Sequence, residues 1–280
     1  MSEEQLDLFI ADIVDVSGRS DLETMEFPLF TISKTKDLST YRYEDPNRDI
    51  WIEVVPSVDG RANIFDKDLL IYCLGQLTEA RNRGRSITRR IQLIPRDFMV
   101  STGRSTGGKD YNRLHESLAR LRGTTIRTNL GEGTTQRGEV FGLIDDANIV
   151  AENGRTIGLE LTISERLFKA LSNGRVLAYN EAYFDLKSPL HRRLYELCRK
   201  HCGQQPLWEI GLEKLHNKVG SNSSLREFKR VLGRAERDQP IPNYIVGLDE
   251  KRRRDTKFYA MYDQRDRVRN HNAAEHLSAH

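Results

Sequence analysis

Apolar residues follow two different periods along the chain. In residues 66–84 they recur at helical spacing, which predicts a helix that begins at an aspartate cap, Asp66 or Asp68, and ends at Gly84. Short alternating runs predict strands, and glycine or proline marks their boundaries. The predicted elements of the first half are a strand at 49–56, the helix at 66–84, a strand at 91–94, a proline-started helix that ends at Gly103, a helix at 109–123 and a hairpin at 124–146.

The same order of elements recurs in the second half of the chain. Its predicted elements are a helix at 189–203, a strand at 206–210, helices at 211–220 and 224–237, and a hairpin at 241–262. A shift of 117 residues places Leu93 on Ile210, Phe98 on Leu215 and Gly103 on Gly220, and a shift of 114 places Tyr111, Leu114, Leu118 and Leu121 on Leu225, Phe228, Leu232 and Ala235. A shared order of five elements favours a duplicated unit over a chance match of short helices.

Helix, strand, helix, turn, helix and hairpin is the element order of a winged helix-turn-helix. We therefore expect an α+β protein with two tandem winged helix-turn-helix domains and an acidic N-terminal tail. The expected boundaries are a flexible acidic segment at 1–40, a first winged-helix domain at 41–180, a second at 181–270 and a flexible C-terminal tail at 271–280.

The last helix of each copy has an apolar side, which packs on its domain, and an opposite polar side. The polar side is rich in residue types that read base edges, because arginine pairs with guanine, asparagine with adenine and glutamate with cytosine. An ordinary amphipathic surface helix would explain either copy alone, but its repetition in one frame favours base reading. The expected base-reading residues are Lys109, Asn112, Arg113, Glu116 and Arg120 in the first copy and Ser223, Arg226, Glu227, Arg230 and Arg234 in the second.

Charge is distributed unevenly, although the formal net charge is only +3. Residues 1–60 hold 14 acidic and 5 basic residues, whereas residues 61–280 hold 27 and 39. A basic body attracts polyanions such as nucleic acid, and a solvated basic surface is the alternative interpretation. The residues expected to contact the DNA backbone or minor groove are Arg104, Lys229, Arg137, Lys251, Arg252, Arg253, Arg254 and Lys257.

Composition favours a cytoplasmic globular protein. The 280 residues are 38% hydrophobic, which is enough for a buried core. No window approaches the run of about 18 apolar residues that a membrane span needs. The first residues also lack the basic start and the cleavage site of a signal peptide.

The sequence offers little support for a zinc site, a nucleotide-binding loop or a DNA-nicking site. Cys198 and Cys202 lie near two histidines, but a zinc site normally shows paired two-residue spacings, and the helical pattern makes Cys198 a buried apolar residue. Residues 103–109 have the glycine and lysine spacing of a phosphate-binding loop, but Asp110 stands where Ser or Thr should bind Mg²⁺. The paired histidines of a nicking initiator are missing, and Tyr195 fits the apolar side of its helix. We therefore expect no catalytic residues, no metal and no cofactor.

Several segments also resemble a known family. Residues 25–34, 60–77 and 183–203 are similar to the replication initiator protein A family of bacterial plasmids, and the resemblance extends from about residue 27 to about residue 262. It implies two tandem winged-helix domains that bind repeated sequences, called iterons, at a plasmid origin. It also implies opening of AT-rich DNA, recruitment of the host replication initiator and helicase, and a monomer-dimer equilibrium in which the dimer represses its own gene.

Two function classes remain open. One is an origin-binding initiator, and the other is a winged-helix transcriptional regulator that binds an inverted operator. Two reading helices in one chain favour the initiator, because one polypeptide then covers two successive major grooves, whereas most repressors pair two chains.

The N-terminal segment holds one further candidate site. The sequence Gln5, Leu6, Asp7, Leu8, Phe9 resembles the short peptide with which bacterial replication proteins bind the sliding clamp. Leucine and phenylalanine would fill an apolar pocket of the clamp, while the glutamine donates a hydrogen bond at its rim. A mobile, solubilising tail is the alternative interpretation.

Overall fold

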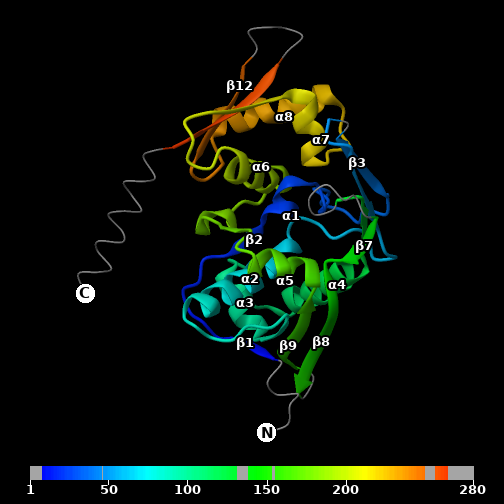
Figure 1. The fold of residues 1–280 in the computed structure, drawn as a ribbon, viewed down its shortest axis with the longest axis vertical. Helices are drawn as coiled ribbons and strands as arrows, with labels where there is room; N and C mark the ends of the chain where they lie inside the picture. Colours follow the sequence, from blue (N-terminus) through cyan, green and yellow to red (C-terminus); the bar gives the residue numbers. More distant parts are fainter. Residues whose placement is uncertain (1–7, 46, 131–137, 153–154, 250–255, 264–280) are drawn as a thin grey trace, which may run out of the picture. The chain divides into compact units, whose positions relative to one another are not determined.

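The computed structural model describes residues 8–45, 47–130, 138–152, 155–249 and 256–263 (Figure 1). The chain divides into two compact units, residues 1–185 (unit 1) and residues 186–280 (unit 2). Both units combine helices with mostly antiparallel sheet, so the fold class is mixed α+β. None of the helices in these ranges has the length and apolar character that crossing a membrane requires.

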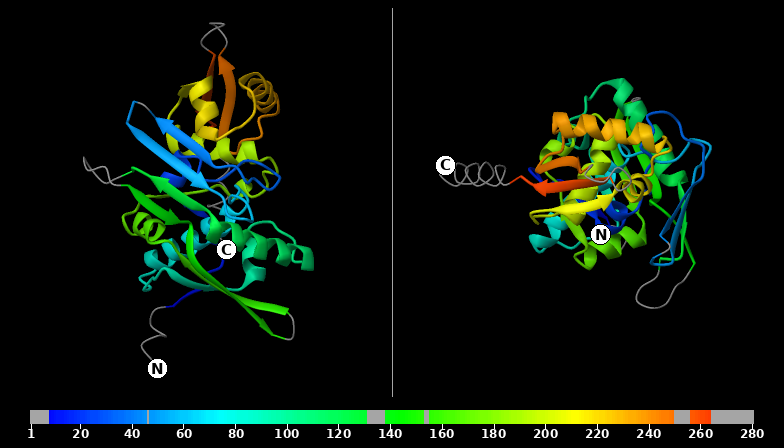
Figure 2. Two further views of the ribbon diagram at one scale, coloured as in Figure 1. Left: turned by 90° about the vertical axis from the view of Figure 1, so that its right-hand side faces the viewer. Right: turned by 90° about the horizontal axis from the view of Figure 1, so that it is seen from above.

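The repeated part of unit 1 is built on a four-stranded sheet with the order β1-β5-β9-β8. β5, which lies between α2 and α3, pairs antiparallel with β9, and Leu93 stands opposite Leu159. β8 and β9 form a long hairpin that extends from unit 1 (Figure 2). The elements are β1 (Phe9–Ala11), α2 (Lys67–Asn82), β5 (Arg90–Leu93), α3 (Pro95–Ser101), α4 (Gly108–Gly123), β8 (Ile144–Glu152) and β9 (Arg155–Ile163).

Unit 1 contains two further sheets. A four-stranded antiparallel sheet has the order β3-β4-β6-β7, and β2 pairs with β10 in a two-stranded sheet. The strands are β2 (Arg19–Asp21), β3 (Tyr41–Asp45), β4 (Ile50–Val55), β6 (Thr125–Thr128), β7 (Glu139–Gly142) and β10 (Val176–Ala178), and the remaining helices are α1 (Leu22–Glu26), α5 (Glu165–Ser172) and η2 (Glu181–Tyr183).

Unit 2 consists of three helices and one three-stranded antiparallel sheet within its described residues. The strand order is β11-β13-β12, so the strand between the first two helices again pairs with the second strand of the hairpin. Tyr195 is fully buried, as its helical position predicts. The elements are α6 (Pro189–His201), β11 (Trp208–Gly211), α7 (Leu212–Val219), α8 (Leu225–Asp238), β12 (Tyr244–Asp249) and β13 (Lys257–Tyr262).

The two alignments of the sequence repeat match the structure. Gly103 and Gly220 both have positive φ, +63° and +74°, and both follow the second helix of their copy. Phe98 and Leu215 are both buried in that helix. In the third helix, Leu114, Leu118 and Leu121 of α4 are buried, as are Phe228, Leu232 and Ala235 of α8. Each third helix therefore packs through the face that the sequence indicates.

The hairpin of the first copy lies at other residues than the sequence predicts. Residues 124–146 were expected to supply it, and β6 does pair with β7, but these strands belong to the sheet with β3 and β4. The hairpin that pairs with β5 is β8–β9, which begins only at Ile144. The predicted hairpin is thus a local pairing in another sheet, and the strand that completes the repeat lies further along the chain.

The N-terminal segment also differs from the expectation. β1 pairs in parallel with β5, and Phe9, Ala11 and Ile13 are buried. Gln76 of α2 both donates to the Ile13 carbonyl (2.7 Å) and accepts from the Ile13 amide (3.1 Å). Residues 9–31 therefore belong to unit 1. Within the segment at 1–40 that was expected to be flexible, residues 1–7 lie outside the described residues, and so does the tail expected at 271–280.

Candidate DNA-binding interface

α8 presents a basic face to solvent. Its N-terminus is capped by the Ser224 hydroxyl, which accepts a hydrogen bond from the Glu227 amide at 3.3 Å. Phe228 and Leu232 anchor the opposite face in unit 2, so Arg226 and Arg230 point outward. Ser223, Arg226, Arg230 and Arg234 are exposed, and Glu227 is partly exposed, which is the placement that reading a groove requires.

β12 packs alongside α8 (Figure 1). A hollow lies on α8 beside this strand. We call it the α8–β12 hollow, and its lining residues are Arg226, Lys229, Arg230, Gly233, Glu236, Arg237 and Leu248. Four of these side chains are cationic. Lys229 lies at the side of the hairpin, where its ammonium group donates to the Thr256 hydroxyl at 3.4 Å.

Two carboxylates modify this charge. Glu227 accepts two hydrogen bonds from Arg230, at 2.8 and 2.5 Å, and these bonds hold the pKa of Glu227 below its usual value. Glu236 accepts from the Leu248 amide at 3.2 Å, which ties it to β12. In the described part of the chain, Arg226 and Arg237 form no ion pair, so their charges are available to a ligand.

α4 presents a weaker charge than α8. Lys109, Asn112, Arg113 and Glu116 are exposed on it, as the sequence predicts. Arg113, however, donates to Asp110 at 3.0 Å. The face therefore alternates in sign, and it offers hydrogen-bonding groups more than net positive charge.

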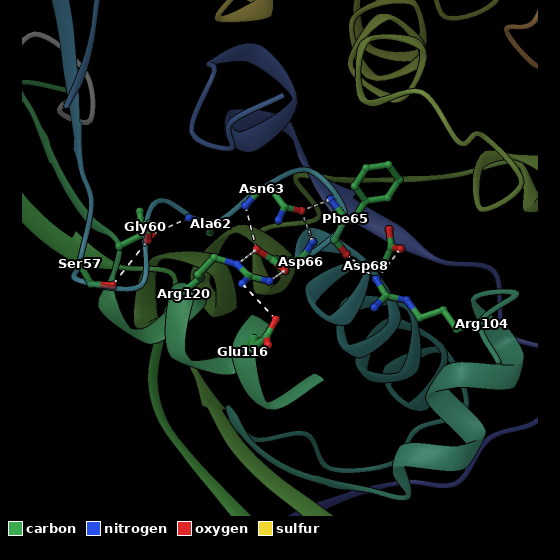
Figure 3. A network of polar contacts seen from close by, with 11 residues as sticks. Ser57, Gly60, Ala62, Asn63, Phe65, Asp66, Asp68, Arg104, Glu116 and Arg120 are labelled. Atoms are coloured by element: carbon green, nitrogen blue, oxygen red, sulfur yellow. Dashed lines mark hydrogen bonds and ion pairs between the residues drawn. The ribbon is translucent and has the colours of Figure 1, made fainter. Parts of the chain in front are cut away.

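Arg120 has a different environment from the other predicted base readers. Its guanidinium donates two hydrogen bonds of 2.8 Å to Asp66, the residue that precedes α2, and its side chain is only 18% exposed (Figure 3). The bonds to Asp66 raise the pKa of Arg120. Glu116 is a more distant partner at 3.9 Å. Arg120 therefore fastens α4 to the start of α2, and we correct its assignment as a base reader.

Arg104 also forms hydrogen bonds within unit 1. It donates to the Phe65 carbonyl and to Asp68 (2.9 Å), whose side chain is almost fully buried (Figure 3). This residue was expected to contact the DNA backbone. Instead its guanidinium connects the turn between α3 and α4 to the first turn of α2.

We expect Asp66→Asn to lower the free energy of unfolding of unit 1 by about 1.5–3 kcal/mol, because the variant has no carboxylate to accept the two bonds from Arg120. Urea unfolding followed by Trp51 fluorescence, with Trp208 replaced by Phe, reports on unit 1 alone. Glu116→Gln is the matched control, since Glu116 is exposed and its 3.9 Å contact with Arg120 contributes about 0–1 kcal/mol. Equal effects of the two substitutions would show that Asp66 does not anchor α4.

The hairpins are unlike in charge. Arg137 and the run Lys251–Arg254 lie outside the described residues, and Lys257 is about half exposed with Glu209 at 3.8 Å. The β8–β9 hairpin, by contrast, carries Asp145 and Glu160, which accept from Arg89 and Arg90. Residues 186–280 hold 20 basic and 12 acidic residues, whereas residues 1–185 hold 24 and 29. Positive charge is therefore concentrated in unit 2.

The structure also places the residues of the phosphate-loop spacing, the cysteine and histidine group and the clamp-like peptide. Asp110 accepts a hydrogen bond from the Ser105 hydroxyl at 2.5 Å, so a carboxylate occupies the loop that has phosphate-binding spacing. Cys198 and Cys202 are buried, and the ring of His201 stacks on Trp208 with centroids 5.0 Å apart. The described ranges hold no cluster of His, Cys, Asp and Glu suited to a metal ion. Of the clamp-like peptide, Phe9 is buried at 3% exposure and Leu8 is partly buried, while Gln5–Asp7 lie outside the described residues.

The architecture has relatives among solved structures. Two crystal structures of domains 2 and 3 of RctB are similar, with TM-scores of 0.63 and 0.55. They cover 87% and 84% of this chain and 99% and 95% of their own, at 14% sequence identity. The likeness shows a shared mixed α+β fold.

Sequence comparison gives the family. The model of the family described as Replication initiator protein A matches residues 19–246. A protein of Wigglesworthia glossinidia brevipalpis named "Putative replication protein" is 38% identical over 246 residues, which cover 86% of this chain and 88% of the relative. The chain belongs to the replication initiator protein A family.

Proposed function

We propose that this protein initiates plasmid replication by binding iterons in double-stranded origin DNA through α4 and α8. The observation that carries the proposal is the exposed basic face of α8, mounted on α7 and flanked by the β12–β13 hairpin. Side chains on such a helix reach base edges in a major groove, while neighbouring cations contact phosphates. Family membership supports origin DNA as the ligand.

The proposal includes two tandem winged helix-turn-helix domains. It is supported by the repeated topology, in which β5-β9-β8 and β11-β13-β12 pair in the same order around equivalent helices. Because the exposed face of α8 is more basic than that of α4, the two helices contribute differently to DNA binding. α8 and its basic hairpin grip one half of the site, and the more neutral α4 reads the other with fewer phosphate contacts.

Three later steps are part of the same proposal. DNA-bound initiator promotes opening of adjacent AT-rich DNA, and it recruits the host replication initiator and helicase. Homodimers in equilibrium with the monomer repress the initiator's own gene. The sliding clamp is a weaker candidate partner, because clamp binding through Phe9 requires β1 to leave the core of unit 1.

The salt dependence of DNA binding tests the proposal. Replacing Lys251–Arg254 with alanine should weaken binding to origin and unrelated duplexes alike. It should also lower the slope of log affinity against log salt by roughly 0.9 for each phosphate that the variant no longer neutralises. Lys34→Ala with Lys36→Ala, two exposed lysines of unit 1, is the control. A wild-type protein without salt-dependent affinity for duplex DNA would contradict the proposed function. An unchanged salt slope in the variant would show that residues 251–254 do not contact DNA phosphates.

A further inference from the structure

Gly233 stands in the interior of α8, where glycine is less favourable to the helix than alanine. The protein's own packing does not require it, since a Cβ at Gly233 would meet no atom within 4 Å. Gly247 of the adjacent β12 is a contrast, because a Cβ there would lie 2.4 Å from the Tyr259 hydroxyl. Gly233 thus leaves open a space that the folded chain itself does not fill.

The open space lies among cations. Gly233 lines the α8–β12 hollow, with Lys229 and Arg230 one helical turn before it and Arg237 one turn after it. Residues three and four apart share a helix face, so these side chains surround the missing Cβ. The carboxylate that also lines the hollow, Glu236, is engaged by the Leu248 amide. The surroundings therefore favour an anion that approaches α8 closely.

We propose that the hollow at Gly233 receives the sugar-phosphate backbone of one DNA strand, and that the absence of a side chain permits this approach. The inference rests on the proposed function and assigns a specific contact within it. Glycine is the residue that allows another backbone to come close, and arginine guanidinium groups bind phosphate through paired hydrogen bonds. Arg237, which lines the hollow and forms no ion pair in the described part of the chain, has its guanidinium available for that phosphate.

The first copy lacks this feature. The alignment of α4 with α8 places Ala119 on Gly233 and His115 and Glu116 on Lys229 and Arg230. α4 therefore has a methyl group and a carboxylate where α8 has a gap and cations. The backbone contact is specific to unit 2, and substituting alanine at Gly233 introduces the residue that α4 carries.

Gly233→Ala separates this contact from folding. The variant should unfold at the same temperature as the wild type or higher, because alanine favours the helix. Its affinity for duplex DNA from the region flanking its gene should fall at least about tenfold. Gly211→Ala, whose Cβ also meets nothing within 4 Å, should leave the affinity unchanged. Both affinity and thermal midpoint are measured on the full chain.

Duplexes with single methylphosphonate linkages locate the contact. Neutralising the phosphate that enters the hollow should weaken binding by the wild type but not by Gly233→Ala, since the added methyl group already keeps that phosphate out. A Gly233→Ala protein that binds as tightly as a DNA-binding wild type would overturn the inference and leave the proposed function intact. A wild type that binds no duplex would overturn both.

Discussion

Replacing both Arg226 and Arg230 with alanine is expected to weaken binding to origin DNA by about 2–6 kcal/mol in free energy, since removing one side chain that reads a base costs about 1–3 kcal/mol. The two side chains lie one helical turn apart on the exposed face of α8. Neither contributes to the core, so the variant should fold as the wild type does. Specificity should relax at the base pairs that these residues read, within one half of the site.

The companion variant tests the other reading helix. Asn112→Ala with Arg113→Ala in α4 should relax specificity in the other half of the site. Arg42→Ala with Arg127→Ala is the charge-matched control for the Arg226→Ala, Arg230→Ala variant, because both side chains are about half exposed on the β3-β4-β6-β7 sheet. Binding is measured by fluorescence anisotropy on duplexes with single base-pair changes. Unaltered affinity in both reading variants would refute the assignment of α4 and α8 as reading helices.

Phe9→Ala is expected to have the largest effect on stability, about 3–5 kcal/mol in the free energy of unfolding of unit 1. The ring is 3% exposed in β1, next to Arg85, whose guanidinium carbon lies 5.3 Å from the ring centroid. Arg85 also donates to Asp12 and to the Ile10 carbonyl, which fixes the strand at the sheet edge. Truncating the ring leaves a cavity and loosens that edge.

Ile10→Ala is the matched control, because the neighbouring side chain in β1 is 52% exposed and should matter far less. Urea unfolding of both variants, read from Trp51 fluorescence with Trp208 replaced by Phe, gives the comparison. If residues 5–9 instead formed a mobile clamp-binding peptide, Phe9→Ala would leave the unfolding midpoint where it was and abolish binding to purified clamp.

The helix boundaries and the buried face of α8 could be predicted from residues that are close together in the sequence. Pro95 and Ser224 start their helices, and Gly103 and Gly220 adopt the left-handed conformation just after theirs. Helical spacing also placed the buried face of α8 correctly. These features depend on residues a few positions apart, which a single sequence displays directly.

The errors involve partners that are distant in the sequence. Periodicity placed Arg120 on the polar side of α4, but its partner Asp66 is 54 residues away and no local pattern reveals it. β5 likewise pairs with β9, about 70 residues further on, while the nearer β6–β7 hairpin satisfied the local pattern. For β1 a signal was present, since Phe9, Ala11 and Ile13 alternate, but the many acidic residues around them favoured a flexible segment.

Footprinting on the DNA that flanks the gene, with DNase I for protection and permanganate for unpaired thymine, tests the central claim most directly. The account predicts protection of several direct repeats and permanganate-reactive thymines in neighbouring AT-rich DNA. Protection should fail in the Arg226→Ala, Arg230→Ala variant. Protection of a single inverted repeat without unpaired thymines would contradict the account and identify a transcriptional regulator instead.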